Sequence, residues 1–524
     1  MRKRPGSFGR IAVATAIVLS TVSLPACVAD EILNPLGATR HVAPDGSDAS
    51  DGSATSPWRT VQHAANVLRP GETVYVHDGI YHERVSVNVS GSAVGGHVTL
   101  AAYPGDRPIL DGTGLPIPNE NAAMILIDDR SYVIVDGFEI RNDRATRADQ
   151  FPTGILLVGA PEHVTIRNCI VHHIANNLPA SDGNGPFANG IAVYGTRAPE
   201  AARDIRIEGN ELHHLETGGS ETLVVNGNVD GFAIVGNYIH HVNNIAIDCI
   251  GYEGTAPLEA FDRARNGLVS ANRIEKISGE GNRYYTSDPY GALGIYVDGG
   301  RDIVIERNAI LRTDFGIEIA SEHPGKSARD IVIASNVVAE SRTVGLSVGG
   351  WIADWGGAEN VTIVNNTFYQ NDALRGGHGE VAFLRHVDGI TFSNNIVYAN
   401  EQAAFLLQEA PAGGGVRADH NLFFSPRGNA DGFWVWEGRE FATFAAYRAK
   451  SGNDGSSLVA DPHFEAPDAG NFLPEPGSPC IDAGDNQAVP ESAGSDHAGG
   501  PRILDGDGDW DAIVDIGAFE SPEI

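Results

Sequence analysis

The chain has 524 residues, of which 42% are hydrophobic, and it carries a formal net charge of -32 at pH 7. Such a charge repels nucleic acids and anionic lipid headgroups, and it disfavours a highly anionic polysaccharide unless cations intervene. This length can bury a large core and would ordinarily indicate several domains, unless the chain is built from repeats.

The N-terminus has the layout of an export signal. Basic residues at positions 2–4 precede an apolar run, 11–22, that is too short to span a membrane as a stable helix. The segment Leu24-Pro25-Ala26-Cys27 resembles a bacterial lipoprotein box, which would make Cys27 the lipid-modified first residue of the mature protein. We therefore expect residues 1–26 to be a signal peptide and residues 27–38 a tether. The expected location is the cell envelope or the outside of the cell, with a lipid at Cys27 as the only membrane contact and simple secretion as the alternative.

An internal repeat decides the expected fold. The motif apolar-x-x-Asn-x-apolar recurs nine times, and each repeat holds two or three short strands of period two with no amphipathic helix between them. Parallel strands without helical crossovers indicate a coil that returns to its start after three short strands. The recurrent asparagines are expected to be structural turn residues. They are Asn168, Asn210, Asn237, Asn272, Asn308, Asn336, Asn366, Asn395 and Asn421.

With this repeat the sequence resembles the right-handed parallel β-helix proteins, the superfamily of pectate lyases and many glycoside hydrolases. The resemblance spans residues 39–520 and implies an all-β solenoid over residues 39–430. Ser56-Pro57 is expected to open a short helix, ending at Leu68, that caps the N-terminal end of the core. Residues 431–524 resemble the C-terminal module of many secreted β-helix proteins, and we expect them to form an irregular cap.

The remaining cysteines, Cys169, Cys249 and Cys480, are far apart in sequence and odd in number. They do not form the pattern of a disulfide framework. We expect them to be buried apolar side chains.

Aligning one strand from each of six repeats places acidic side chains together. The aligned strands begin at Gly190, Thr222, Asn244, Gly294, Gly316 and Gly345. Their third and fifth side chains point the same way, because side chains alternate along a strand. The fifth position of the first four strands holds Tyr194, Asn226, Asp248 and Asp298 in turn, and the third position of the fourth and fifth strands holds Tyr296 and Glu318. We expect Asp248 to stack on Asp298, about 4.8 Å away, with Glu318 diagonal to Asp298.

Three adjacent carboxyls repel one another unless one keeps its proton or all share a cation. The first arrangement is that of a glycosidase, and the leading hypothesis is a carbohydrate-active enzyme that hydrolyses a polysaccharide or oligosaccharide and requires no cofactor. Asp298 is the expected nucleophile or base and Glu318 the general acid, with Asp248 or Glu322 tuning or replacing one of them. Aromatic faces bury the apolar side of a sugar ring. The expected substrate-binding residues are Tyr194, Asn226, Tyr284, Tyr285, Tyr296, Glu322, Trp351 and Trp355.

Two other functions fit the same residues. In a Ca²⁺-dependent polysaccharide lyase acting on uronates, Asp248, Asp298 and Glu318 would hold the ion and Lys326 would abstract the proton. A non-catalytic protein that binds glycans or builds an envelope layer would instead leave the acidic column exposed and without a pocket. The fold alone separates none of these functions.

Two further patterns remain. Three pairs of adjacent histidines occupy nearly equivalent places after the recurrent asparagine and are expected to form a solvent-facing column, with a groove lining or a metal site as alternatives. They are His172-His173, His213-His214 and His240-His241. In the tail, Asp505, Asp507, Asp509 and Asp511 alternate with glycine and tryptophan. Oxygen ligands at every second residue suit a small structural Ca²⁺ loop, although the distal glutamate of an EF-hand is missing.

Overall fold

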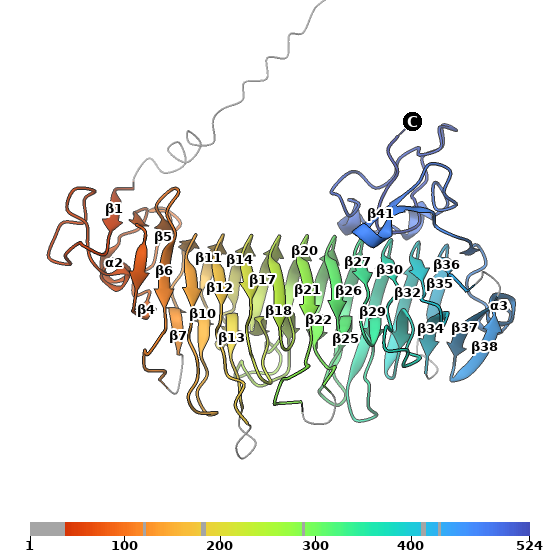
Figure 1. Cartoon of the computed structure of the whole chain (residues 1–524), viewed down its shortest axis with the longest axis horizontal. Coiled ribbons are helices and arrows are strands. Elements are labelled where there is room, and N and C mark those ends of the chain that lie inside the picture. The colour runs from red at the N-terminus through yellow and green to blue at the C-terminus, as the bar shows by residue number, and fades with distance from the viewer. Residues whose placement is uncertain are drawn as a thin grey trace, which may run out of the picture.

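The computed structural model describes residues 37–118, 122–179, 185–285, 289–409, 415–427 and 431–523. The expected signal peptide and Cys27 lie outside these residues. The described chain winds into a right-handed parallel β-helix of three long sheets, and its strands stack along the long axis of the molecule (Figure 1). Within the described residues, no helix is long and apolar enough to cross a membrane. The all-β fold expected from the repeat is confirmed.

The three sheets are here called A, B and C. Along the chain, each coil adds a strand to sheet A, then to sheet C and then to sheet B. Sheet A contains β1 (Thr39–Val42), β2 (Thr73–Val76), β5 (Val98–Ala102), β8 (Val133–Asp136), β11 (Glu162–Arg167), β14 (Ala202–Glu208), β17 (Val229–Val235), β20 (Ala264–Ser270), β23 (Arg301–Glu306), β26 (Ser327–Ala334), β29 (Gly357–Val364), β32 (Val387–Ser393) and β35 (Val416–Asp419). Sheet B contains β4 (Val85–Ser86), β7 (Ala123–Asp128), β10 (Thr153–Gly159), β13 (Asn189–Gly195), β16 (Leu223–Gly227), β19 (Ile247–Ile250), β22 (Leu293–Asp298), β25 (Phe315–Ala320), β28 (Val344–Val348), β31 (Val381–Phe383), β34 (Ala404–Gln408), β37 (Asp431–Trp436) and β38 (Arg439–Thr443). Sheet C contains β3 (Gly79–Tyr81), β6 (Pro108–Asp111), β9 (Glu139–Arg141), β12 (Ile170–His172), β15 (Glu211–His213), β18 (Tyr238–Val242), β21 (Arg273–Ile277), β24 (Ala309–Thr313), β27 (Val337–Ala339), β30 (Thr367–Tyr369), β33 (Ile396–Tyr398), β36 (Leu422–Phe424) and β39 (Leu458–Val459).

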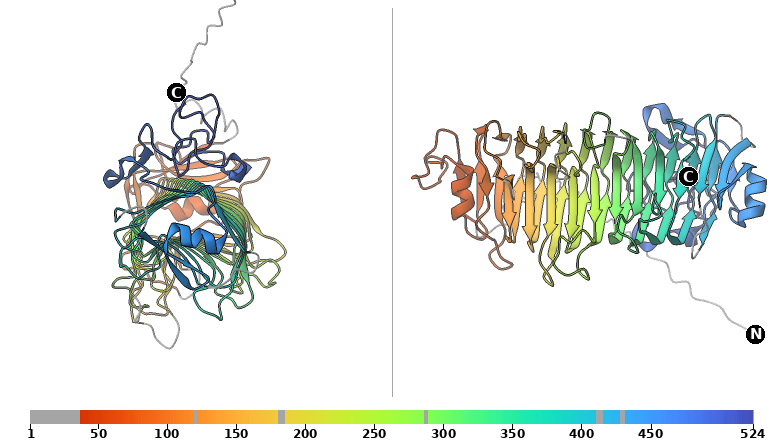
Figure 2. Two further views of the ribbon diagram at one scale, coloured as in Figure 1. Left: turned by 90° about the vertical axis from the view of Figure 1, so that its right-hand side faces the viewer. Right: turned by 90° about the horizontal axis from the view of Figure 1, so that it is seen from below.

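Helix α2 (Val61–Val67) covers the N-terminal end of the core and buries Val61, Ala64 and Ala65. The expected start at Ser56-Pro57 is too early, because Thr60 is the N-cap and its hydroxyl accepts a hydrogen bond from the amide of His63 at 3.1 Å. Trp58 instead continues as extended chain beside Val42. At the opposite end, helix α3 (Phe444–Ser451) lies across the opening of the coil (Figure 2).

The interior is apolar, and one ladder of buried asparagines runs along it. The amide oxygen of Asn308 accepts from both nitrogens of Asn272, and its side-chain nitrogen donates to Asn336 at 2.9 Å. The same bonding continues from Asn210 to Asn421, so the coils are held in register by buried, mutually satisfied amides. The described cysteines are buried and free, as expected.

Asn168 is not part of this ladder, although it matches the recurrent motif and occupies the turn. Its side chain is exposed and its φ is +54°, and the amide nitrogen of Cys169 takes the ladder position by donating to Asn210 at 2.9 Å. The repeat at this coil is therefore offset by one residue. Asn168 occupies the left-handed turn position, which an asparagine tolerates well.

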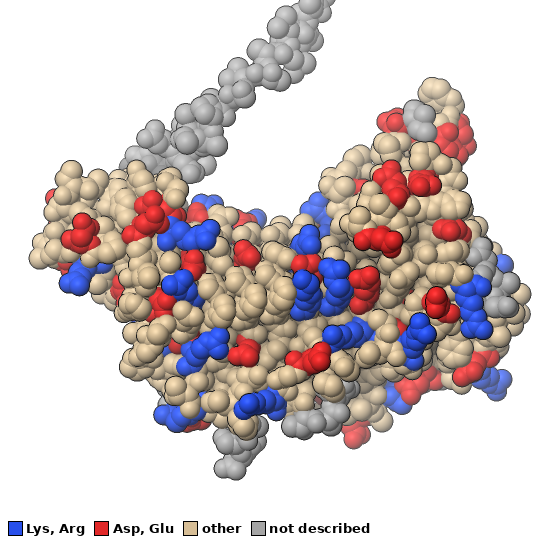
Figure 3. Space-filling model, viewed as in Figure 1, with Lys and Arg blue, Asp and Glu red and all other residues tan. Residues whose placement is uncertain are grey.

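The C-terminal part has two different environments. The antiparallel hairpin β37–β38 and α3 close the end of the coil, where Trp434 and Tyr447 are fully buried. The chain then returns along one flank, with β40 (Phe464–Ala466), β41 (Asn471–Pro474) and the 3₁₀ turns η1 (Pro467–Ala469), η2 (Asn486–Ala488) and η3 (Glu491–Ala493) (Figure 1). There it packs apolar side chains on the outer face of sheet C. This returning segment, residues 464–523, is here called the flank module, and acidic side chains gather on it (Figure 3).

Candidate functional site

The candidate site lies on the outer face of sheet B, around strands β19, β22 and β25. Alternation along these strands sends Ile295 and Val297 into the apolar core and sends Tyr296 and Asp298 outward. The outward side chains are nevertheless buried: Asp248 is 2% exposed, and Asp298 and Glu318 are each 4% exposed. Loops that follow the strands cover this face, so the acidic residues do not form the open column expected of a non-catalytic surface.

The expected register is confirmed for five of the six aligned strands and is wrong only for β19, the strand that contains Asp248. Tyr296 pairs with Glu318 and Asp298 with Ala320, which places Asp298 diagonal to Glu318 as expected. Asp248, however, pairs with Tyr296 rather than Asp298. A shift of two residues keeps every side chain on the same face, so the period-two pattern fixes the face but not this register. Tyr296 therefore lies between Asp248 and Glu318, and Asp298 is diagonal to both.

Loop residues complete a group of six acidic side chains, here called the carboxyl cluster. The cluster consists of Glu221, Asp248, Glu253, Asp298, Glu318 and Glu322. The backbone amide of Glu322 donates to Asp298 Oδ1 at 2.8 Å. Nε2 of His323 lies 3.5 Å from Glu253. Among the described residues, His323 is the only basic side chain that forms an ion pair with the cluster.

Burial raises the pKa of five carboxyls in the cluster, which are Glu221, Asp248, Asp298, Glu318 and Glu322. It raises the pKa of Glu221 to about 7 and that of Glu318 to about 8. Burial and then the neighbouring Glu221 and Asp298 hold the pKa of Asp248 well above its ordinary value, and burial and then Glu322 do the same for Asp298. The indole of Trp351 and the hydroxyl of Ser347 oppose the shift of Glu318. At neutral pH the cluster therefore retains protons that it can donate.

Several buried polar atoms around the cluster have no hydrogen-bond partner of good geometry within the described chain. They are Asn226 Oδ1, Asp248 Oδ1, the Tyr296 hydroxyl, Ser347 Oγ and Trp351 Nε1. Buried polar groups in native proteins are nearly always satisfied, so a set of unsatisfied ones beside the carboxyl cluster is typical of a site that binds a polar ligand.

Most of the expected substrate-binding residues gather at this site. Tyr194 pairs with Asn226 on the adjacent strand, and Tyr285 donates from its hydroxyl to Asn244 at 2.7 Å. The ring of Tyr284 packs edge-on against Tyr285 at 5.4 Å and is nearly half exposed. Trp351 lies beside Glu318. These aromatic groups border the carboxyl cluster.

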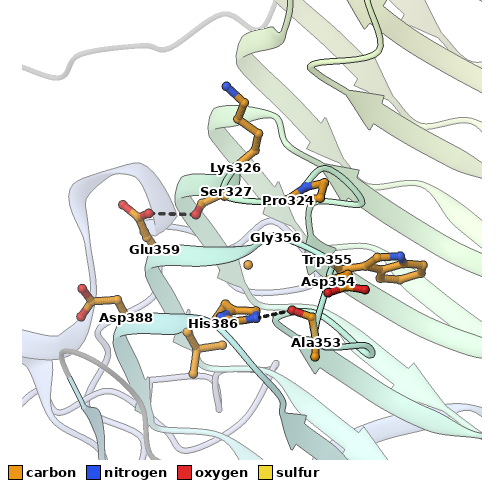
Figure 4. Close-up of a pocket in the computed structure, with 13 residues that line it drawn as sticks. Pro324, Lys326, Ser327, Ala353, Asp354, Trp355, Gly356, Glu359, His386 and Asp388 are labelled. Atoms are coloured by element: carbon orange, nitrogen blue, oxygen red, sulfur yellow. Dashed lines mark hydrogen bonds between the residues drawn. The ribbon is translucent and has the colours of Figure 1, made fainter.

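Trp355 is the exception. It lines a separate hollow of about 860 Å³ together with Glu359, His386 and Asp388 (Figure 4). Lys326 also lines this hollow, but its amine is paired with Glu259 and lies 5.2 Å from the ring of Tyr252. The lysine expected to act as a lyase base is thus engaged by a carboxylate outside the cluster.

Two groups of the described residues have ligand atoms close enough to share a metal ion. Glu253, Asp298 and His323 offer atoms within 4.8 Å of one another at the site, and Asp482, Asp505 and Asp507 do so on the flank module. The tail loop expected to bind Ca²⁺ thus combines only two of its four aspartates with Asp482. Asp509 instead accepts from the amide of Asp511 at 2.9 Å.

The sequence did not point to Glu221, Glu253 or His323. All three lie in loops, outside the period-two strands that identified the other carboxyls. The only available signal was proximity in sequence, because Glu221 directly precedes an aligned strand and His323 directly follows Glu322.

Two family models match the chain. The model described as "Pel9A-like, right handed beta helix region" matches residues 40–250, and the one described as "Right handed beta helix region" matches residues 153–368. "Uncharacterized protein YwoF" of Bacillus subtilis (strain 168) is 36% identical over 440 residues, which cover 84% of this chain and 91% of that protein. "Pectate lyase PEL9" of Emericella nidulans is 27% identical over 183 residues, which cover 30% of this chain and 43% of that protein.

The crystal structure of pectate lyase Pel9A aligns with 93% of this chain and 97% of its own, at 15% identity and a TM-score of 0.45. The match to YwoF extends over most of both chains, and the two family models together span the coils that carry the carboxyl cluster. The chain therefore belongs to a family of right-handed parallel β-helix proteins that includes YwoF, and it shares this fold with carbohydrate-active enzymes.

Proposed function

We propose that the protein is a glycoside hydrolase, with Glu318 as the general acid and Asp298 as the nucleophile or base. The observation that carries this proposal is the placement of these two carboxyls on adjacent strands, diagonal to each other. Loops cover both carboxyls, which are almost fully buried. Diagonal β-carbons on neighbouring strands lie about 7–8 Å apart, so flexible side chains can adopt the carboxyl separations of either glycosidase class.

The electrostatics support these two roles. Glu318, with a pKa of about 8, is protonated at neutral pH and can protonate a leaving glycosidic oxygen. Repulsion limits the number of charges that the cluster carries, and a backbone donor favours the ionised form of the carboxyl that accepts its hydrogen bond. Asp298 has such a donor in the backbone amide of Glu322. Tyr296, between the acidic strands, can donate its unpartnered hydroxyl to the carboxylate that forms.

The surroundings favour a sugar without negative charge. Aromatic side chains border the site, and polar atoms without partners are available for hydroxyl groups. No lysine or arginine forms an ion pair with the cluster in the part of the chain that the structure describes. A uronate would therefore meet carboxyls with no opposing side-chain charge.

A Ca²⁺-dependent lyase acting on uronates is the second candidate. Its support is the match to the pectate lyase PEL9 and the group formed by Glu253, Asp298 and His323, which has the spacing of a metal site. Oxygen ligands suit Ca²⁺, whereas an imidazole does not, so this group is a weaker fit to calcium than three carboxylates would be.

An activity screen separates the two candidates. The protein is incubated with neutral and uronate polysaccharides, with and without EDTA, while reducing ends and the absorbance of unsaturated uronates are followed together. A hydrolase produces reducing ends from a neutral glycan without the absorbance, and EDTA leaves its rate unchanged. Absorbance from a uronate polymer that EDTA abolishes would refute the hydrolase. Glu318→Gln is the matched variant, because it removes the acidic proton at nearly constant volume.

A further inference from the structure

The paired histidines form a second group of functional side chains, on sheet C and separate from the carboxyl cluster. His172, His213 and His240 are register partners on β12, β15 and β18. Their rings stack at 4.8 and 5.1 Å with interplanar angles of 6° and 9°. The residue that follows each of them is also a histidine, and these outer rings stack at 5.5 and 5.0 Å.

Within each pair, the two Nδ1 atoms face each other. They are 2.5 Å apart in His172-His173 and 2.7 Å apart in the other two pairs. The two rings of a pair are close to perpendicular, at 78° to 86°. The outer histidine of each pair has a positive φ of 52–55°, and this left-handed backbone turns its ring back toward the inner one. The fold therefore repeats one arrangement of converging imidazoles three times.

Carboxylates fix the tautomer of the inner ring in two of the pairs. Nε2 of His172 lies 3.2 Å from Glu139, and Nε2 of His240 lies 3.1 Å from Glu211. A carboxylate only accepts hydrogen bonds, so each Nε2 carries the proton and each Nδ1 presents a lone pair to the gap between the rings. His213 has no such carboxylate among the described residues, because the equivalent position on the preceding strand is Ile170.

We infer that the His172-His173 and His240-His241 pairs are binding sites for a transition-metal ion of the Zn²⁺ type, coordinated by the two Nδ1 atoms of a pair. A histidine that binds a metal through one ring nitrogen usually donates the N–H of its other ring nitrogen to a carboxylate, which fixes its tautomer and orientation. Imidazole suits zinc, copper and nickel rather than calcium or magnesium. Two nitrogens bound to one zinc at about 2.05 Å lie roughly 3.0–3.4 Å apart, so each pair has to open by only about half an ångström.

The outer histidine changes its tautomer when the ion binds. Without the ion, its Nδ1–H donates to the inner Nδ1. With the ion, the proton moves to Nε2, and both Nδ1 lone pairs coordinate the metal. His241 is exposed, so solvent can take and return this proton, whereas His240 is buried and held by Glu211. Water fills the remaining coordination positions.

Calorimetric titration of the full chain with Zn²⁺ tests the inference. The protein is produced without a histidine tag and stripped with EDTA. We expect saturable Zn²⁺ binding that Ca²⁺ does not compete for, and at least a 100-fold loss of affinity in the combined variant His172→Gln, His213→Gln and His240→Gln. Glu211→Gln should weaken the His240-His241 site by about 10–100-fold, because it removes only the support of the ligand.

Controls address other sites and the integrity of the fold. His323→Gln removes the imidazole beside the carboxyl cluster, and the paired variant His82→Gln, His463→Gln removes exposed histidines elsewhere. Both variants should keep the Zn²⁺ sites at the two histidine pairs. His241→Gln changes an exposed side chain and should remove the His240-His241 site while it leaves the His172-His173 site. The loss of one Zn²⁺ site can therefore be read even if the combined variant is unstable. An unchanged number of Zn²⁺ sites in His241→Gln, or loss of binding only in His323→Gln, would overturn the inference.

Discussion

Replacing Glu318 with glutamine should make the protein more stable at neutral pH while removing its activity. The folded chain keeps the proton of Glu318 up to a pKa of about 8, whereas the unfolded chain loses it near 4.5. Between these two values the folded state binds more protons, so the contribution of Glu318 to stability falls as the pH rises. Glutamine has no proton to lose and does not carry this penalty.

The magnitude follows from the two pKa values. Each pH unit between them is worth about 1.4 kcal/mol. From the ordinary value of 4.5 to pH 7, the wild-type protein therefore loses about 3 kcal/mol relative to Glu318→Gln. Below pH 4.5 both states of the wild-type protein are protonated and the difference between the two proteins should be constant.

Thermal unfolding of both proteins across this pH range measures the effect. The variant should melt at a progressively higher temperature than the wild type as the pH rises from 4.5 to 7. Glu401→Gln, at a side chain that is 79% exposed, is the matched control and should show no such trend. A difference in melting temperature between wild type and Glu318→Gln that stays constant over this range would refute the buried, protonated acid.

Three further predictions concern other parts of the molecule. Asn308→Ala removes four ladder hydrogen bonds and should lower the free energy of unfolding by about 2–4 kcal/mol, whereas Asn88→Ala, at an exposed residue, should change it little in denaturant titrations. Ca²⁺ should raise the melting temperature through the flank loop, and Asp505→Asn should abolish the increase; an unchanged melting temperature after EDTA treatment would exclude this site. Asp298→Asn should lower turnover by several orders of magnitude, and azide should partly restore it if the enzyme retains configuration; near wild-type turnover would make Asp298 structural.

The sequence predicted the fold and the face that carries the site because both depend on periodicity. Recurrent asparagines mark the turn of nearly every coil, and alternation assigns each strand residue to the core or to the outer face. Asn168 and Asp248 show the limit of this reasoning. An offset of one residue at a turn, or of two along a strand, leaves the apolar pattern unchanged, so only the backbone hydrogen bonds identify the true register.

The rest of the site comes from loops, whose paths no periodic pattern specifies. Glu221 and Glu253 approach Asp248 and Asp298 only because the chain folds back over sheet B. Trp355 resembled Trp351 in sequence, but it lines the separate hollow beside Glu359 and His386 because it lies four residues further along the same loop. Burial also depends on these loops, and it is burial that raises the pKa of Glu318.

The turnover of Glu318→Gln on two substrates with different leaving groups tests the proposed chemistry most directly. A glycan identified in the activity screen is compared with an aryl glycoside of the same sugar, whose leaving group needs no protonation. The account predicts that Glu318→Gln loses several orders of magnitude in turnover on the glycan but far less on the aryl glycoside, whereas Asp298→Asn loses activity on both. Wild-type turnover of the glycan by Glu318→Gln would contradict the assignment of this carboxyl as the general acid.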